Sequence, residues 1–349
     1  MPIRKQVTLK SLAASLGVTV QTVSKALRGK PGMSPATRAA IVEAARTSGY
    51  LTRDQLRQFS VERIAVYPPA KRRFVLVQTE QSLNFNRLLL EGLNERFSEI
   101  GHTIETLLLP ERMNEKKLDQ WIRTKELHYC EGIFIAPRLT PPEWERTLLD
   151  LPIPRILLNY PSPGMPVDSV VWDVSTAVAL AVKHLADIGH RRIMYAGDIR
   201  TQRGFALRWQ SFAEAVRACG LPFEPQAHLT DSDGDAHARS ERLASLLATC
   251  KPTAILCGID EEVEPLYAAI RRLGLDVPTD LSLIGLLNEQ KESLPLFTRP
   301  LLAIKETGYR AAERMLWRIA NPTMPYEYIR IQAAVFAGST TAAWEQNRD

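Results

Sequence analysis

Side chains able to read a DNA base or hold a phosphate gather within residues 19–28. Gln21 carries an amide that can pair with adenine through two hydrogen bonds, and Lys25 can donate to the O6 and N7 acceptors of guanine. Val20 can touch the methyl group of thymine. Thr22 and Ser24 carry hydroxyl groups suited to phosphate contacts. Each residue type is ordinary on a surface, but the combination is typical of a helix that reads the major groove.

Three short helices are predicted to position these side chains. Thr8 can cap a helix that runs to about residue 16, because an apolar stripe at i, i+3, i+4 and i+7 follows it. Gly17 permits the left-handed backbone of a tight exit, and Thr19 can cap a second helix over about residues 19–27. Ser34 can cap a third, with Pro35 at its first position. The pattern predicts a helix-turn-helix whose second helix enters the major groove.

The charge of the chain is concentrated at its N-terminal end. Residues 1–60 contain ten Lys/Arg and two Asp/Glu and so carry +8, whereas the whole chain carries +5. The rest of the chain therefore carries −3. A basic head on a mildly acidic body is the electrostatic pattern of a nucleic-acid reader joined to a second module, with a solvated basic terminus as the alternative.

Two runs make the N-terminal pattern specific. V-x-x-x-T-V-S-K-A-L at residues 18–27 and G-K-P-G-x-S-P-x-T-R at residues 29–38 resemble the N-terminal domain of the lactose-repressor (LacI/GalR) family. The resemblance implies Val20, Gln21 and Lys25 as base readers, although the family usually has arginine at the position of Lys25 and asparagine at that of Arg28. The expected DNA contacts are Thr8, Val20, Gln21, Thr22, Ser24, Lys25, Arg28, Arg57 and Phe59.

Residues 52–73 are predicted to form a hinge or linker. The family has a short hinge helix there, which folds on DNA and pushes a leucine into the minor groove. Arg57 fits that pattern, and Phe59 falls at the position of the leucine, where phenylalanine is also a known wedge. Thr52 and Arg53 replace the usual proline and asparagine. The alternative is therefore that Phe59 packs against the body.

Short apolar runs alternate with helical patterns over most of the remaining chain, which predicts parallel sheets flanked by helices. Glycines at residues 101, 189, 220 and 274 each follow a predicted helix, where a C-cap needs them. The strands are too many for one sheet, so two lobes with a ligand cleft at the carboxyl ends of the strands are expected. The predicted strands are residues 74–78, 104–109, 132–137, 155–160, 169–172, 192–197, 253–258 and 282–287.

This body also resembles that of the lactose-repressor family, a two-lobed, periplasmic-binding-protein-like domain. The resemblance covers residues 8–340. The fold class expected is thus a small all-α helix-turn-helix head plus a two-lobed α/β body with parallel sheets. The predicted domains are the head at 1–51, the linker at 52–73, the effector-binding and dimerisation domain at 74–340 and a tail at 341–349. The tail lacks a leucine heptad, so a homodimer is expected.

The resemblance also implies a set of effector-binding residues. Arg208 matches an arginine that binds effector hydroxyls or carboxylates, and a guanidinium suits that task because of its planar donor fork. Ile259 and Leu287 stand where the family has polar sugar contacts, so either the effector is less hydroxylated than a sugar or effector control is altered or lost. The effector expected is a sugar, a sugar acid or another small organic acid. The alternatives are a salt bridge for Arg208 and helix capping for the acids. The expected set is Asn84, Asp173, Arg208, Asp260 and Asn288.

Other function classes lack their motifs. No phosphate loop, dinucleotide fingerprint, nucleophile elbow or zinc-protease motif occurs, so no enzyme and no cofactor are expected. The histidines and four cysteines have no metal-ligand spacing. A basic N-terminus without an apolar stretch predicts neither a secretory signal nor a membrane anchor, hence a cytoplasmic protein.

The sequence as a whole predicts a ligand-responsive transcription regulator, most simply a repressor that binds a pseudo-palindromic DNA operator as a homodimer. One alternative is a DNA-binding regulator whose body binds a partner protein or has lost its effector response. A solute-binding protein is the other, but it would not need the basic helix-turn-helix.

Overall fold

The computed structural model describes residues 7–28, 30, 32–48, 50, 72–110, 114–139, 142–230 and 236–344. The chain divides into two compact units, Met1–Val66 and Tyr67–Asp349, and each is described by itself. Within the described ranges, no helix is long and apolar enough to cross a membrane.

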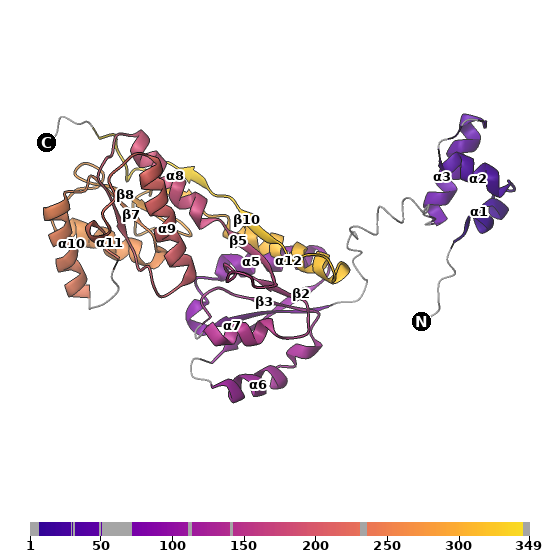
Figure 1. The fold of residues 1–349 in the computed structure, drawn as a ribbon, viewed down its shortest axis with the longest axis horizontal. Coiled ribbons are helices and arrows are strands. Elements are labelled where there is room, and N and C mark those ends of the chain that lie inside the picture. The colour runs from indigo at the N-terminus through magenta and orange to yellow at the C-terminus, as the bar shows by residue number, and fades with distance from the viewer. Residues whose placement is uncertain are drawn as a thin grey trace. The chain divides into compact units, whose positions relative to one another are not determined.

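The head consists of α1 (Leu9–Ser15), α2 (Val20–Leu27) and α3 (Pro35–Ser48), as predicted (Figure 1). The side-chain oxygens of Thr8 and Thr19 accept hydrogen bonds from the third backbone N–H of α1 and α2, so both residues cap as expected. Gly17 has a φ of +63°, which the tight turn between these helices requires. The apolar faces meet in a small core of Leu12, Ala13, Val23, Ala26, Ile41 and Ala45.

The body begins with a six-stranded parallel sheet in the order β10-β5-β4-β3-β1-β2, which forms lobe 1. Its elements are β1 (Arg73–Thr79), η1 (Glu80–Ser82), α5 (Arg87–Glu99), β2 (Thr103–Leu109), α6 (Glu115–Thr124), η2 (Leu127–Tyr129), β3 (Gly132–Ile135), α7 (Pro142–Leu149), β4 (Arg155–Leu157), β5 (Asp168–Trp172), α12 (Ile304–Ala320) and β10 (Tyr328–Ile331). Helices α6 and α7 pack on one face, where Val75, Val77 and Ile135 point. The other face carries Phe74, stacked on Phe97 of α5 at 4.3 Å between ring centroids.

Lobe 2 contains a three-stranded parallel sheet, β6-β7-β8, and an antiparallel pair, β9 with β11. Its elements are α8 (Val174–Asp187), β6 (Ile193–Ala196), α9 (Arg203–Ala218), η3 (Pro225–Ala227), α10 (Ala236–Cys250), β7 (Ala254–Cys257), α11 (Asp260–Arg272), β8 (Ser282–Gly285), β9 (Arg299–Leu301) and β11 (Ala334–Phe336). Helices α10 and α11 contribute Leu243, Val263 and Ile270 to the core beneath this sheet.

All eight predicted strands are present, and the predicted two-lobed α/β body is confirmed. The four junction glycines have φ between +68° and +99°, so each adopts the left-handed conformation that follows a helix. The sequence pattern missed β9, β10 and β11, which have three or four residues each. Because β10 and β11 are largely exposed, they lack the buried apolar runs by which the other strands were recognised.

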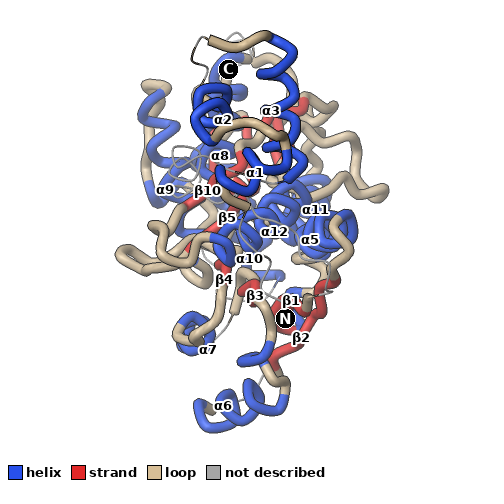
Figure 2. The backbone as a smooth tube through the Cα atoms, turned by 90° about the vertical axis from the view of Figure 1, so that its right-hand side faces the viewer, coloured by secondary structure: helices blue, strands red, loops and turns tan. Residues whose placement is uncertain are grey.

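Helix α12 returns the chain to lobe 1 and lies side by side with α5 (Figure 2). Their backbones approach closely through Gly92 and Gly308, where an added Cβ would collide with the carbonyl oxygen of Lys305 and of Leu89 respectively. Both helices therefore need glycine at the crossing.

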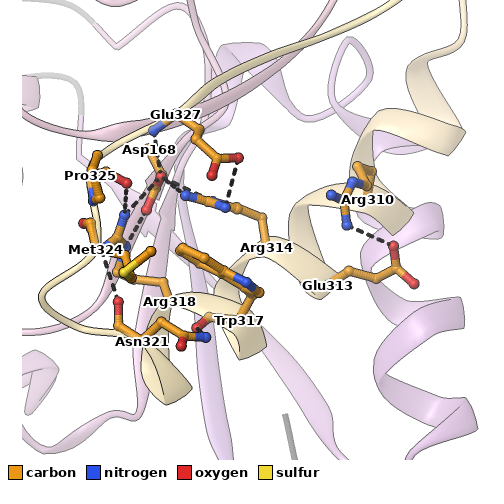
Figure 3. Close-up of polar contacts among 10 residues, drawn as sticks. All are labelled: Asp168, Arg310, Glu313, Arg314, Trp317, Arg318, Asn321, Met324, Pro325 and Glu327. Carbon is orange, nitrogen blue, oxygen red and sulfur yellow. Dashed lines mark hydrogen bonds and ion pairs between the residues drawn. The ribbon is translucent and has the colours of Figure 1, made fainter. Parts of the chain in front are cut away.

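A buried ionic cluster joins α12 to β5 (Figure 3). The Asp168 carboxylate, which is completely buried, accepts hydrogen bonds from Arg314 (Nη2–Oδ1, 2.7 Å) and Arg318 (Nη2–Oδ1, 3.2 Å). Arg318 also donates to the carbonyl oxygens of Met324 (2.7 Å) and Pro325 (2.8 Å), just before β10. The cluster thus fixes the segment that leads into the edge strand of lobe 1.

His190 is a buried imidazole whose protonation opposes folding. Its Nδ1 lies 2.9 Å from Thr253 Oγ1 and its Nε2 lies 3.2 Å from the carbonyl oxygen of Ala342. Burial lowers the pKa of His190 to about 4. Since the unfolded chain then binds the proton more readily, stability is complete above pH 6.5 and is lost as the pH falls toward 4.

We therefore expect the free energy of unfolding to fall by about 3 kcal/mol between pH 6.5 and pH 4 through His190 alone. Urea titrations at several pH values measure it, and the His190→Asn variant should show a correspondingly shallower decline. His237→Asn, at an exposed histidine on α10, is the matched control and should follow the wild-type profile. Equal slopes for wild type and His190→Asn would contradict the prediction.

Candidate DNA-reading face and effector cavity

Helix α2 presents the predicted base readers on one side. At 100° per residue, Val20, Ser24, Arg28, Gln21 and Lys25 fall within an arc of about 140°. Val20, Gln21, Lys25 and Arg28 are exposed, and Val20 keeps 42% of its surface open to solvent. The buried Val23 and Ala26 lie on the opposite side. The helix can therefore offer amide, ammonium and methyl groups to base edges while its other side packs in the head.

Thr8, Thr22 and Ser24 also have partners within the head. The Thr8 hydroxyl forms a capping box with Ser11, and the Thr22 hydroxyl lies 2.8 Å from that of Thr19. Ser24 Oγ accepts a hydrogen bond from Nη2 of Arg28. These contacts pre-order the side chains, which suits phosphate positioning more than base selection. The other two predicted contacts, Arg57 and Phe59, lie outside the described residues.

Arg38 is a positioning residue that the sequence analysis did not single out. From α3 its Nη1 donates to the carbonyl oxygen of Ala26 (3.1 Å) and its Nη2 to that of Lys30 (2.5 Å). The first bond satisfies a carbonyl at the end of α2 and the second a carbonyl in the loop that follows, so Arg38 holds both against α3. The sequence feature that pointed to Arg38 is its place at the end of the G-K-P-G-x-S-P-x-T-R run.

A cavity opens in the body at the carboxyl ends of β3, β4 and β5, facing the start of α9. Its volume of about 40 Å³ holds a few water molecules. This is the strand edge at which the sequence analysis expected a ligand. The lining residues are Phe85, Pro137, Arg138, Leu158, Asn159, Tyr160, Val171, Trp172, Val174, Gln202, Gly204, Phe205 and Arg208.

Arg208 lines this cavity from α9 and is buried, with 6% of its surface exposed. Its Nε has no hydrogen-bond partner, and no carboxylate within the described residues forms an ion pair with it. Burial lowers the pKa of its guanidinium. The salt-bridge alternative for Arg208 is therefore wrong for the described part of the chain, and a buried cation remains available to a ligand.

The other four predicted effector residues are not among those lining the cavity. Asn84 is exposed in the turn before α5. Asp173 caps α8, where Oδ1 accepts from the backbone N–H groups of Ser175 (3.0 Å) and Thr176 (3.1 Å) and Oδ2 accepts from the Thr176 hydroxyl. The capping alternative thus describes Asp173 as the structure places it.

Asp260 and Asn288 lie close together in lobe 2. Oδ1 of Asp260 accepts a hydrogen bond from the backbone N–H of Asn288 at 3.0 Å. Burial raises the pKa of the Asp260 carboxyl. Their neighbours Ile259 and Leu287 are both buried, and Leu287 belongs to the core of lobe 2.

The aromatic residues that line the cavity were not predicted from the sequence. Phe85 and Trp172 directly adjoin the predicted Asn84 and Asp173, and Phe205 lies one turn before Arg208. Trp172 is the last residue of β5 and Asp173 caps α8, so their side chains point in different directions and the apolar one faces the cavity. Asn84 and Phe85 lie in the turn before α5, where Asn84 is exposed and Phe85 lines the cavity. The only sequence feature that pointed to these residues is the aromatic side chain next to Asn84, next to Asp173 and one turn before Arg208.

Three ion pairs join the lobes around the cavity. Arg138 binds Glu261 of α11 (Nη1–Oε1, 2.6 Å) and its guanidinium lies 3.6 Å from the ring centroid of Phe85. Arg203 of α9 binds Glu145 of α7 (Nη2–Oε2, 2.6 Å). Arg87 of α5 pairs with Glu289. These contacts join the two lobes, and one of them involves the cavity-lining Arg138.

Comparison with known proteins connects both units to one family. The profile described as "Bacterial regulatory proteins, lacI family" matches residues 8–53, and "Periplasmic binding protein-like domain" matches residues 182–341. The chain is 26% identical over 347 residues to "HTH-type transcriptional regulator MalR" of Streptomyces coelicolor, covering 96% of this chain and 97% of that protein. It is 28% identical over 282 residues to "HTH-type transcriptional repressor CytR" of Escherichia coli strain K12, covering 80% and 79%.

Solved structures show the same fold. A lac repressor dimer bound to operator and the anti-inducer ONPF aligns with a TM-score of 0.65 and 19% identity, covering 97% of this chain and all of that one. A complex of the transcriptional regulator CelR with cellobiose aligns with a TM-score of 0.65 and 21% identity, covering 96% and 99%. The head with its exposed α2 face, the two-lobed body and the matches to both units agree with one another. The chain belongs to the lacI family of bacterial regulatory proteins and is a DNA-binding transcription regulator.

Proposed function

We propose that the protein represses transcription as a homodimer that binds a pseudo-palindromic operator and responds to a small molecule in the cavity of its body. The observation that carries the proposal is the exposed face of α2, with Val20, Gln21 and Lys25 on one side of a capped helix. Two such helices in a dimer would enter successive major grooves, about one helical turn apart.

The body supports the ligand response. Arg208 is a buried guanidinium beside a cavity, and the lobes meet there through the Arg138–Glu261, Arg203–Glu145 and Arg87–Glu289 pairs. A ligand that changes how these pairs form would change the angle between the lobes. In a dimer that change alters the spacing of the two heads, a coupling typically of 1–3 kcal/mol.

The base-reading part of the proposal predicts a change in sequence preference. An operator is first selected from random double-stranded DNA with the full chain, and binding is followed by fluorescence anisotropy. Lys25→Ala and Gln21→Ala should each weaken binding by about 1–3 kcal/mol and relax the preference at one base pair per half-site, because each removes a base-edge contact.

Lys10→Ala is the charge-matched control, because Lys10 is an exposed lysine of α1 outside the α2 face. It should leave the base preference unchanged, whatever it does to overall affinity. If both α2 variants keep the base preference of the wild type, Gln21 and Lys25 are not base readers.

Two further assignments belong to the same proposal. We place the protein in the cytoplasm, where an operator is accessible, and we assign it no catalytic activity, because the matched relatives are named as regulators. Within the described residues, no group of three or more His, Cys, Asp or Glu is placed to hold a metal ion. A body that binds a partner protein remains the second candidate, and a ligand-binding measurement on the full chain decides between them.

A further inference from the structure

We infer that the cavity ligand is a small carboxylate with a flat, mostly apolar ring, not a polyhydroxylated sugar. This inference rests on the proposed function, since it names the class of molecule to which the body responds. Two features of the cavity support it: the hydrogen-bonding groups that it offers and the shape of its walls.

The unpartnered polar groups at the cavity are donors. Arg208 has a buried Nε without a partner, and Nε1 of Trp172, whose residue is 6% exposed, also has none. A guanidinium offers donors in a planar fork and accepts nothing. A buried cation without a counter-charge is costly, and a ligand carboxylate relieves that cost with short, charge-assisted hydrogen bonds.

Two of the side chains that line the cavity already use their acceptor oxygens. Tyr160 Oη donates to the carbonyl oxygen of Trp172 (2.9 Å) and accepts from the backbone N–H of Val174 (3.0 Å). Oδ1 of Asn159 accepts from the backbone N–H of Tyr160 at 2.9 Å. No Asp or Glu is among the described lining residues, and the nearby Asp173 caps α8 with both oxygens.

A sugar would find few partners there. Each hydroxyl of a sugar needs an acceptor for its proton as well as a donor, and a buried hydroxyl without an acceptor loses binding energy. Among the described lining residues, the side-chain amides of Gln202 and Asn159 can supply either role, although Oδ1 of Asn159 already accepts one hydrogen bond.

The walls are aromatic. Phe85 and Trp172 lie 5.9 Å apart between ring centroids, and Phe205 and Tyr160 also line the cavity. The other apolar lining residues are Pro137, Leu158, Val171 and Val174. Flat rings pack well in stacked or edge-to-face contact with aromatic side chains. When the lobes are held together, the cavity volume of about 40 Å³ favours a small ligand.

Benzoate, phenylacetate and nicotinate are suitable probes, tested on the full chain by thermal shift and calorimetry. Benzamide is the neutral isostere of benzoate, and D-glucose and cytidine represent hydroxylated ligands. At least one carboxylate should raise Tm, whereas benzamide should bind about 10- to 100-fold more weakly than benzoate because it cannot pair ionically with Arg208.

Variants assign the binding to these groups. Arg208→Met should lose about 10- to 100-fold in carboxylate affinity, and Arg208→Lys should retain part of it. Trp172→Phe keeps the ring and removes one donor, so a loss of a few-fold is expected. Arg191→Met, at an exposed arginine of the same lobe, is the matched control and should bind like wild type. Circular dichroism without ligand establishes that each variant is folded.

The inference is overturned if no carboxylate in the panel binds, if glucose or cytidine binds more tightly than the carboxylates, or if Arg208→Lys and Arg208→Met bind benzoate as wild type does. The proposed function is tested separately by selective operator binding of the ligand-free chain. Selective operator binding together with sugar binding would support the proposed function and contradict only the inferred ligand class. Carboxylate binding without selective DNA binding would support the ligand class and contradict the proposed function.

Discussion

Replacing Asp168 with asparagine is expected to lower the free energy of unfolding of the body by about 3–5 kcal/mol. The Asp168 carboxylate is completely buried, and Arg314 and Arg318, both at least nine-tenths buried, share it. Glu327 is the second partner of Arg314 and is half exposed, so it cannot replace the lost charge. The substitution leaves two guanidiniums against a neutral amide, in a region that water does not reach.

Urea denaturation of the full chain, followed by circular dichroism, measures the loss. Asp187→Asn removes the same charge from the Lys183–Asp187 pair on the surface of α8, where both side chains are more than half exposed. That control should cost less than about 1 kcal/mol, because solvent screens an exposed pair. Similar losses for the two variants would show that burial does not strengthen the Asp168 cluster.

The second large effect is expected at the crossing of α5 and α12. In Gly308→Ala the new Cβ would collide with the carbonyl oxygen of Leu89 and lie 3.0 Å from the backbone nitrogen of Leu93. Backbone atoms cannot turn aside as a flexible side chain does, so the helices must separate. We expect a loss of about 1–3 kcal/mol, the usual cost of overpacking a well-packed interface.

Gly204→Ala supplies the control for Gly308→Ala. Gly204 is also helical, in α9, but an added Cβ would have only Arg208 Nη1 nearby, at 3.7 Å. The same substitution there should leave stability unchanged or raise it by up to about 1 kcal/mol through the unfolded state. A neutral Gly308→Ala, measured alongside it by urea denaturation, would mean that the two helices do not depend on their close approach.

The three helices of the head could be predicted from local sequence features alone. Caps at Thr8 and Thr19, the left-handed Gly17 and the apolar spacing within each helix are all properties of neighbouring residues, so the pattern was sufficient to predict three helices. The parallel strands of the body followed for a similar reason, since a strand buried on both faces is a continuous apolar run. The exposed β10 is recognised only beside β5, with which it pairs.

The candidate site also has a part that local sequence features predicted and a part that they did not. The amino-acid sequence by itself determined the α2 face, because 100° per residue decides which side chains share a side, and its family resemblance pointed to Arg208. Only the tertiary structure decided which residues surround Arg208. The orientation of Trp172 against Asp173 depends on where β5 ends and α8 begins, and the committed acceptors depend on contacts such as Tyr160 with Val174. Burial and hydrogen-bond saturation arise from packing between distant segments, so no pattern along the chain can report them.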